Sequence, residues 1–408
     1  MHCMTSAASL TTLPPLSAAE RAHAARMSEH IRAFIASHGG VIGFDAYMRL
    51  ALYAPGLGYY SAGATKLGGA GDFVTAPEVS NLFSRCLARQ VADILEVTGG
   101  DVLELGAGLG TMAADVLGEL AALDRLPEQY FILEVSADLA ARQRERIGAL
   151  PPELGERVRW LERWPERAMH GVVLANEVLD AMPVSRFVLR GAPGAQQVRA
   201  LGVAAAGAGE SHDQFVWRET EAPPELALAV AGILQALPEP LPDGYVSEIC
   251  LAFQPWVASL AAQLEHGVAL LIDYGLPRAQ LYHPERTTGT LRCHFRHRAH
   301  DDPFVNVGLQ DITAWVDFSR VAEAADGAGL ETLGFATQAA FLIGAGMESL
   351  LTTDMQLADG DPQRQARLAG EARRLMLPGE MGEIFKVIAL GRGYHEPLAG
   401  FGTQNLRL

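Results

Sequence analysis

Glu104 ends a short apolar run and is followed by glycines at alternate positions, Gly106, Gly108 and Gly110. Glycines in a strand-to-helix turn let a ligand approach the backbone closely, and the amide N–H groups of the next helix then face it. A strand, a glycine loop and a helix in this order are typical of a site for an adenine-containing cofactor. The sequence therefore predicts a cofactor site over residues 104–111.

Two cofactors compete for this loop. A dinucleotide fingerprint would place its last glycine at position 111, but Thr111 stands there and the third glycine comes one residue early. A pyrophosphate would also be repelled by an acid at position 104. S-adenosyl-L-methionine (SAM) instead offers an ammonium group for Glu104 and a carboxylate for the loop amides. The pattern favours SAM, and a dinucleotide is the alternative.

A second acid, Glu134, follows another apolar run, 30 residues after Glu104. An acid at this place can accept hydrogen bonds from both ribose hydroxyls, in NAD sites and SAM sites alike. Ser136 ends the same run, and we predict that it contacts the cofactor. Thr75, from a segment considered below, is expected to do so as well.

Three polar residues, Asn176, Glu177 and Asp180, follow the apolar run 171–175. Ligands of open α/β sheets bind beyond the carboxyl ends of the strands, so these side chains are expected beside the sulfonium of SAM. We predict that the three are catalytic. The alternative is structural, with Asp180 capping a helix and Asn176 making a turn. Asp273 ends a further run, 267–273, and could be functional or could cap a loop.

A segment rich in histidine and arginine lies over residues 287–302. Cys293, His294, His297 and His300 could suggest zinc, but interleaved arginines oppose a divalent cation and no second ligand pair has metal-like spacing. We therefore predict no metal and interpret the segment as a solvated or substrate-facing loop. A basic loop of this kind could also orient an acidic region of the cap or a partner.

Length and composition bound the class of protein. With 408 residues the chain is long for one core, and its 49% apolar and 20% charged residues are typical of a soluble globular protein. No stretch is long and apolar enough to span a membrane. The net charge of −16 argues against nucleic-acid binding. The four scattered cysteines and the lack of a visible targeting segment favour the cytoplasm, or the mitochondrial matrix if the source is eukaryotic.

Strands and helices alternate from residue 101, which predicts an α/β fold with a parallel sheet covered on both faces. The last two expected strands should close the sheet as an antiparallel pair. We expect a disordered tail and a mainly helical cap over residues 1–98, with a glycine-rich loop at 63–71. The core should cover 99–391, with insertions at about 184–266 and 276–325, and a C-terminal tail should follow at 392–408. The expected strands are 101–105, 130–135, 157–161, 171–175, 267–273, 330–335 and 384–390.

Several strings of residues together resemble the MidA family, which includes the mitochondrial complex I assembly factor 7. They are 71–80, 104–110, 176–183, 271–275, 289–302, 311–318 and 378–387. The resemblance covers about residues 44–390, and one departure is Asn306-Val307-Gly308, where relatives often have Pro-Gly.

The resemblance implies a class I, Rossmann-like, seven-stranded SAM-dependent methyltransferase that acts on protein arginine, with a subunit of respiratory complex I or a similar protein as its substrate. It also carries the cofactor role to Glu104, to the three glycines and to Glu134. Asn176 and Glu177 match the family's acid motif after the strand.

Arginine is a demanding methyl acceptor because its guanidinium stays protonated in proteins. A carboxylate must hold it and favour charge on the nitrogens that are not methylated. We assign this part to Glu177, with Asp180 as a second candidate and Asn176 as a positioning group. The expected partner is a protein that presents an arginine, and an oligomer is possible. The alternatives are a SAM-binding assembly factor without turnover, a small-molecule methyltransferase and an NAD-dependent oxidoreductase.

Overall fold

The structure is a computed structural model that describes residues 13–61, 74–207 and 214–408. Its central sheet has the strand order β14-β15-β9-β4-β1-β2-β3, and the short strand β13 pairs with β9. The strands from β9 to β3 run parallel, whereas β15 runs antiparallel to both of its neighbours, β9 and β14. The bounds are β1 Asp101–Leu105, β2 Tyr130–Leu133, β3 Val158–Leu161, β4 Met169–Asn176, β9 Leu264–Leu276, β13 Val316–Asp317, β14 Glu331–Thr337 and β15 Phe385–Arg392.

All seven predicted strands are present, and the antiparallel closing pair is confirmed. Strands β1 and β4 lie in the middle of the sheet, so their side chains are buried on both faces. Leu103 and Val173 face one hydrophobic cluster, whereas Val102 and Val172 face the other. This explains why the runs are continuously apolar and easy to recognise. The largest difference is β9, which extends beyond the expected run at both ends.

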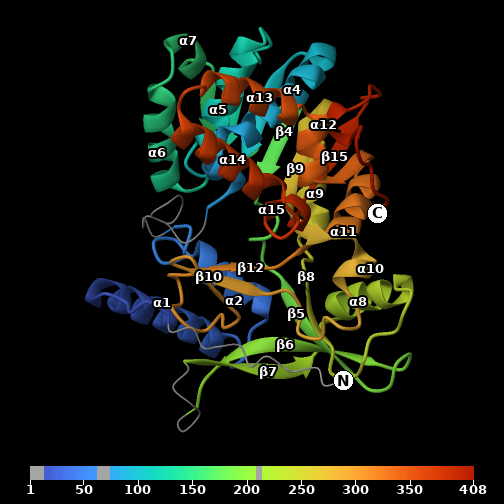
Figure 1. The fold of residues 1–408 in the computed structure, drawn as a ribbon. Helices are drawn as coiled ribbons and strands as arrows, with labels where there is room; N and C mark the ends of the chain where they lie inside the picture. The colour runs from blue at the N-terminus through green and yellow to red at the C-terminus, as the bar shows by residue number, and fades with distance from the viewer. Residues whose placement is uncertain (1–12, 62–73, 208–213) are drawn as a thin grey trace.

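Helices cover both faces of this sheet (Figure 1). One face packs against α4 (Asn81–Thr98), α5 (Thr111–Ala122) and three helices from the segment between β14 and β15. Those three are α12 (Gln338–Gly344), α13 (Met347–Leu357) and α14 (Pro362–Met376). The other face packs against α9 (Phe253–Gln263) and α11 (Phe318–Gly327). The result is the layered α/β fold that the alternating pattern predicts.

The first 98 residues do not form one cap, so the expected boundary there is corrected. Helices α1 (Ala18–Ser37) and α2 (Phe44–Tyr53) pack beside the inserted strands, and Ile42 forms a β-bridge with Val203. Helix α4 instead shares its buried stripe with the central sheet. A helical period shows that one side of α4 is buried, but it does not show against which element. The expected loop at 63–71 and most of the expected disordered tail lie outside the described residues.

The two insertions form separate small sheets. The first contains a four-stranded sheet of order β7-β6-β5-β8, in which β5 and β6 form a hairpin, and helix α8 (Pro224–Ala236). The second contains a three-stranded sheet of order β11-β10-β12. The bounds are β5 Ser185–Arg190, β6 Gln197–Ala205, β7 Phe215–Glu221, β8 Val246–Ile249, β10 Arg292–Phe295, β11 Arg298–His300 and β12 Asp311–Thr313. Both sheets lie below the central sheet in Figure 1.

The remaining elements are short or lie at the edges. Four of them are single-turn helices, and one is a 3-10 turn near the C-terminus. Their bounds, with that of the longer helix α6, are α3 Ala76–Val79, α6 Ala137–Gly148, α7 Pro152–Gly155, α10 Arg278–Leu281, α15 Met381–Ile384 and η1 Ala399–Phe401.

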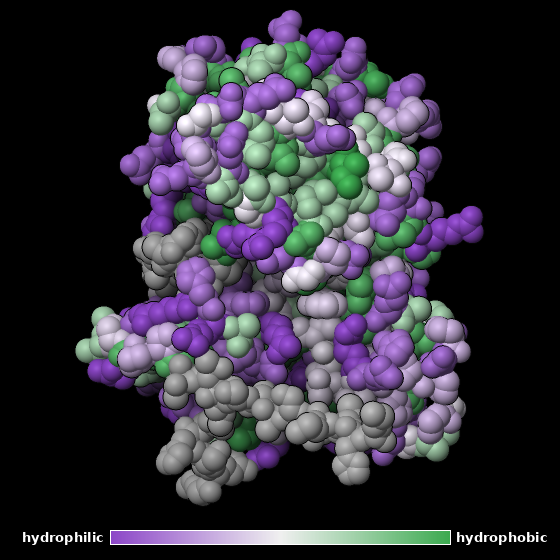
Figure 2. Space-filling view, viewed as in Figure 1, coloured by the Kyte–Doolittle hydropathy of each residue, from purple (hydrophilic) through white to green (hydrophobic). Residues whose placement is uncertain are grey.

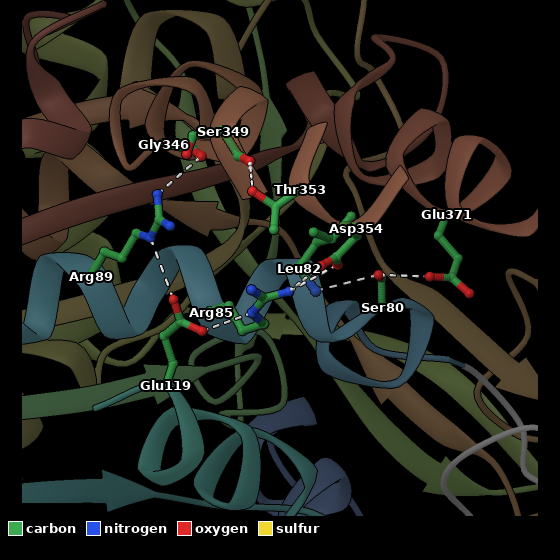
Figure 3. A network of polar contacts seen from close by, with 10 residues as sticks. All are labelled: Ser80, Leu82, Arg85, Arg89, Glu119, Gly346, Ser349, Thr353, Asp354 and Glu371. Atoms are coloured by element: carbon green, nitrogen blue, oxygen red, sulfur yellow. Dashed lines mark hydrogen bonds and ion pairs between the residues drawn. The ribbon is translucent and has the colours of Figure 1, made fainter. Parts of the chain in front are cut away.

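A polar network fastens α13 and α14 to the sheet helices (Figure 3). Arg85 of α4 donates to Glu119 of α5 at 2.8 Å and to Asp354 of α13 at 2.8 Å. Ser80 caps α4 by accepting from the amide of Leu82, and its hydroxyl donates to Glu371 of α14 at 2.8 Å. The network therefore joins four helices through side chains that are partly shielded from water.

The C-terminal residues, which the sequence predicts as a tail over 392–408, are held against the molecule. Residues 385–392 belong to β15, and Phe401 packs against Phe341 of α12. Beyond them, Gln404 and Asn405 accept hydrogen bonds from the amides of Thr337 and Phe335 in β14.

The outer surface mixes polar and apolar side chains. Figure 2 shows hydrophobic residues gathered over the region of α12 and α14, where Ile343 and Leu377 are about half exposed. Among the described residues, no helix is both long enough and apolar enough to cross a membrane.

Candidate active site

A cavity of about 370 Å³ lies at the carboxyl ends of four neighbouring strands. The strand order β4-β1-β2-β3 arranges their end residues along the cavity in the same order. Of the predicted site residues, Gly110 and Asp180 are not among those that line it. The predicted residues that do line it are Thr75, Glu104, Gly106, Gly108, Glu134, Ser136, Asn176 and Glu177. A larger hollow of about 900 Å³, between α2, β5, β6 and α8, contains none of them.

The glycine loop requires glycine for reasons of backbone geometry. Gly106, Gly108 and Gly110 have φ values of 64°, 54° and 78°, in the left-handed region. A Cβ atom on Gly110 would lie 3.3 Å from the backbone of Gln143. Gly110 caps α5 without a side-chain hydrogen bond, so the first amide groups of α5 remain available for a ligand. Gly110 therefore shapes the loop from behind the cavity surface.

Glu104 is almost completely buried at the floor of the cavity, with 1% of its surface exposed. Its Oε2 accepts a hydrogen bond from the Tyr130 hydroxyl at 2.6 Å. Burial raises the pKa of Glu104 to about 7, and the hydrogen bond offsets only part of this effect. A cation placed beside Glu104 would favour its ionised form. Glu104 is thus suited to bind an ammonium group.

Glu134 is held in place by backbone and side-chain donors. Its Oε1 accepts from the amide of Ser136 at 2.8 Å, and its Oε2 accepts from Nε2 of Gln143 at 3.0 Å. The same Nε2 donates to the carbonyl of Gly108 at 2.9 Å, while Trp160 donates to Oε1 of Gln143 at 3.0 Å. Gln143 therefore joins the glycine loop, the acid after β2 and strand β3.

Sequence reasoning missed Gln143. A weak signal was present, because Gln143 occupies the buried stripe of α6 together with Ala140 and Ile147. A polar residue on such a stripe requires hydrogen-bond partners in the folded protein.

Glu177 follows β4 in a left-handed conformation with φ 53°, which is uncommon for a residue other than glycine. The amide of Glu177 donates to the carbonyl of Ile272 at 2.9 Å, which fixes this turn against β9. Its carboxylate accepts from Nδ2 of Asn176 at 3.1 Å and from the amide of Ala76. Burial, and then the negative charge of Asp180, raise the pKa of Glu177 to about 8.

Asp180 lies behind the cavity wall, which corrects the expectation that all three polar residues face the cofactor. It is 4% exposed and accepts a hydrogen bond from the Tyr274 hydroxyl. Asp273 accepts from the amides of Leu179 and Asp180 at 2.8 and 3.2 Å. Asp273 therefore fastens the loop after β4, which is the loop-capping alternative. Burial raises the pKa of Asp180 to about 6 and that of Asp273 well above its usual value.

Residues that precede the sheet complete the cavity, and most of them were not predicted. Thr75 is the N-cap residue of α3, and Glu78 of this helix accepts a hydrogen bond from the Thr111 hydroxyl. Tyr53 and Tyr60 also line the cavity, and Tyr60 donates to Asp311 at 2.9 Å. These contacts join segments far apart in the sequence, so no local pattern could reveal them.

The histidine- and arginine-rich segment forms a hairpin of β10 and β11, with Cys293 opposite His300. Arg296 contacts Glu20 of α1 at 2.6 Å. Within the described ranges, no group of three or more His, Cys, Asp or Glu side chains is placed to hold a metal ion.

Known proteins share this architecture. The family model “Putative S-adenosyl-L-methionine-dependent methyltransferase” matches residues 86–336. A crystal structure of a “likely methyl transferase” from Burkholderia thailandensis, bound to S-adenosyl-homocysteine, is 44% identical with a TM-score of 0.89, covering 97% of this chain and 99% of that one.

Curated relatives are more distant. “Protein arginine methyltransferase NDUFAF7 homolog, mitochondrial” from Drosophila melanogaster is 30% identical over 92% of this chain and 87% of its own length. The mouse NDUFAF7 protein is 29% identical over 86% and 81%.

The fold and the strand-end cavity define a Rossmann-like protein of the SAM-dependent methyltransferase class. The chain belongs to the family that this model describes, and the resemblance to MidA and NDUFAF7 proteins is confirmed. Family membership also confirms SAM as the cofactor.

Proposed function

We propose that this protein methylates an arginine side chain of a protein substrate. The observation that carries the proposal is that one cavity is lined both by Glu104 and Glu134 and by the acid Glu177. Relatives named protein arginine methyltransferases support the choice of arginine. A respiratory complex I subunit, which the family resemblance implies, is the first candidate substrate. The cytoplasmic location remains a prediction from the sequence.

The donor groups of the cavity fit SAM. Glu104 would bind its ammonium, the amides of the glycine loop its carboxylate, and Glu134 its ribose hydroxyls. Leu133 at the end of β2, Trp164 beyond β3 and other apolar residues of the cavity provide a surface for the base. When bound, the cofactor supplies an electrophilic methyl group on a sulfonium.

Glu177 would hold the guanidinium of the substrate. The free protein keeps this carboxyl largely protonated at neutral pH because of its burial. An approaching guanidinium favours the ionised form, and the carboxylate then draws positive charge toward the nitrogens that it contacts. The remaining nitrogen keeps more of its lone pair for the methyl group. Asn176 orients Glu177 through the 3.1 Å hydrogen bond.

Asp180 and Asp273 act as positioning residues in this proposal. Asp273 fixes the amides of Leu179 and Asp180, so the loop that bears Glu177 has a defined shape. Preorganisation of this kind lets binding energy align the reacting groups. The role of Asp180 is thereby moved from direct contact to support of the loop.

The test uses the purified protein, SAM with a trideuterated methyl group, and protein extract from source cells that lack this protein. Mass spectrometry should find the heavy methyl group on arginine of one or a few proteins. The matched control is Glu177→Gln, which should bind SAM within about threefold of the wild type and lose at least about 100-fold in labelling.

Three results would contradict the proposal. Label on another residue type or on a small molecule would indicate a different methyltransferase. SAM binding without label in any fraction would indicate a SAM-binding assembly factor. Undiminished labelling by Glu177→Gln would reject the role of Glu177 alone.

A further inference from the structure

Two tyrosines contribute a stacked aromatic wall to the cavity. Tyr53 ends α2 and Tyr60 follows seven residues later, and their rings stack at 5.4 Å with 22° between the planes. The Tyr53 hydroxyl donates to the carbonyl of Ala181 at 2.9 Å, and the Tyr60 hydroxyl donates to Asp311 at 2.9 Å. Both hydroxyl protons are therefore committed to the protein, and the rings are held in fixed positions.

This wall stands at the Glu177 end of the cavity. Ala181, which accepts the Tyr53 hydrogen bond, lies four residues after Glu177 and lines the same cavity. Trp164 lies beyond β3, at the opposite end of the strand order. Since β1 and β2 lie between, a cofactor held by Glu104 and Glu134 leaves the tyrosine end for the substrate.

The charged groups around the wall favour the binding of a planar cation. Glu177 interacts electrostatically with Asp180 and Asp311, and Asp311 accepts the Tyr60 hydroxyl. Negative charge beside aromatic rings favours a cation that can stack on a ring and also donate hydrogen bonds. A guanidinium does both, because it is planar and carries five N–H donors, whereas a neutral group of the same shape gains only the hydrogen bonds.

We propose that Tyr53 and Tyr60 form the wall against which the substrate guanidinium stacks, and that they set the specificity for arginine. This inference rests on the proposed function, because it assumes an arginine substrate. It assigns substrate recognition to the α2 region and cofactor binding to the central sheet.

The test needs no identified substrate. The probe is an adenosine whose 5′ carbon carries, through a thioether, an alkyl chain that ends in a guanidinium. The reference probe ends in a urea, which has the same planar shape without the charge. Calorimetric titration gives Kd for both probes with the wild type and with Tyr53→Leu, Tyr60→Leu, Tyr53→Phe and Trp164→Leu.

The wild type should prefer the guanidinium probe by at least about tenfold, and each leucine variant at the tyrosine wall should reduce this preference by at least about threefold. Binding of the urea probe should change less than about twofold in the same variants. Tyr53→Phe keeps the ring and should keep the preference. Trp164→Leu, the control at the other end of the cavity, should weaken both probes equally.

The outcomes separate the two proposals. A wild type without preference would reject arginine as the substrate, and the tyrosine wall with it. A preference that survives both leucine variants, or an equal loss of both probes in them, would reject the wall alone. Should a leucine variant not fold, phenylalanines with increasing fluorination at position 53 preserve the shape of the ring. The preference should then fall stepwise with ring electron density, and a flat series would overturn the inference.

Discussion

The backbone amide of Ala76 donates a hydrogen bond to the carboxylate of Glu177. Ala76 is the first residue of α3, which precedes the central sheet in the chain. Glu177 is the first residue after β4. The bond favours the ionised carboxylate and so opposes the effect of burial on its pKa. The position and charge of the proposed catalytic acid therefore depend on a segment that is distant in the sequence.

The stability of the free protein should fall as the pH rises from about 5 to about 8. The folded-state pKa of Glu177 is about 8 and that of Glu104 is about 7, both above the ordinary value of 4.5. The folded protein therefore binds more protons than the unfolded chain between these values, and raising the pH removes that advantage. Between pH 5.5 and pH 8.5, Glu177→Gln should lose roughly 2 kcal/mol less unfolding free energy than the wild type.

Urea unfolding of the two proteins at both pH values measures this effect. The control is Glu166→Gln, because Glu166 has a side chain that is 86% exposed. A variant at position 177 that follows the wild-type pH profile would contradict the prediction.

Glu104→Gln should weaken SAM binding about tenfold or more, because the ammonium loses its charged partner. In the wild type, SAM affinity should rise between pH 6 and pH 8, since the pKa of Glu104 is about 7 and only the ionised form pairs with the ammonium. Calorimetric titration checks both effects. 5′-Methylthioadenosine lacks the amino-acid part of SAM, so its affinity should be insensitive to the substitution and to pH. An equal loss for both ligands would indicate general damage to the cavity.

Gln143→Leu should destabilise the protein by roughly 2 kcal/mol, because the Gly108 carbonyl and the Trp160 N–H lose their hydrogen-bond partner in a buried setting. SAM affinity should fall with it, since Glu134 loses the hydrogen bond that Gln143 donates. Urea unfolding and titration measure the two effects. Gln356→Leu, on the exposed side of α13, is the control and should change neither quantity appreciably. Normal SAM binding by Gln143→Leu would show that Glu134 does not need this support.

Ser80→Ala should cost about 1 to 2 kcal/mol of unfolding free energy, because Ser80 caps α4 and also donates to Glu371. A double-mutant cycle with Glu371→Ala should give a coupling of roughly 1 kcal/mol. The measurement is urea unfolding of the four proteins. Additive single effects would show that the contact in Figure 3 contributes nothing beyond the cap.

Strands and acids of the sheet could be predicted because their signals are local. A central parallel strand is buried on both faces, so it appears as a continuous apolar run such as residues 171–175. An acid at or just beyond the carboxyl end of such a run lies where open α/β sheets bind ligands, and this is how Glu104, Glu134 and Glu177 were found. The direction in which each side chain points was harder to predict from the sequence. Glu177 adopts a left-handed conformation that the sequence did not reveal, and Asp180 is not among the residues that line the cavity.

Residues that reach the site from distant segments could not be predicted. Gln143 acts through three partners on separate elements, and Tyr53 reaches the cavity from a helix that precedes the sheet. A sequence period describes how a helix is buried but not which surface it meets, as the assignment of α4 to a cap illustrates. Tertiary contacts of this kind depend on loop geometry that spacing alone does not encode.

The contact between the C-terminal residues and β14 has a consequence for association between molecules of this protein. An outer strand offers unpaired amide and carbonyl groups on which a second molecule could build a cross-molecular sheet. Side chains of Gln404 and Asn405 take up the amides of Thr337 and Phe335, and the amide of Leu406 donates to the Phe335 carbonyl at 2.6 Å. Residues 404–406 therefore cover the outer side of β14 and should oppose aggregation through this strand, away from the proposed active site.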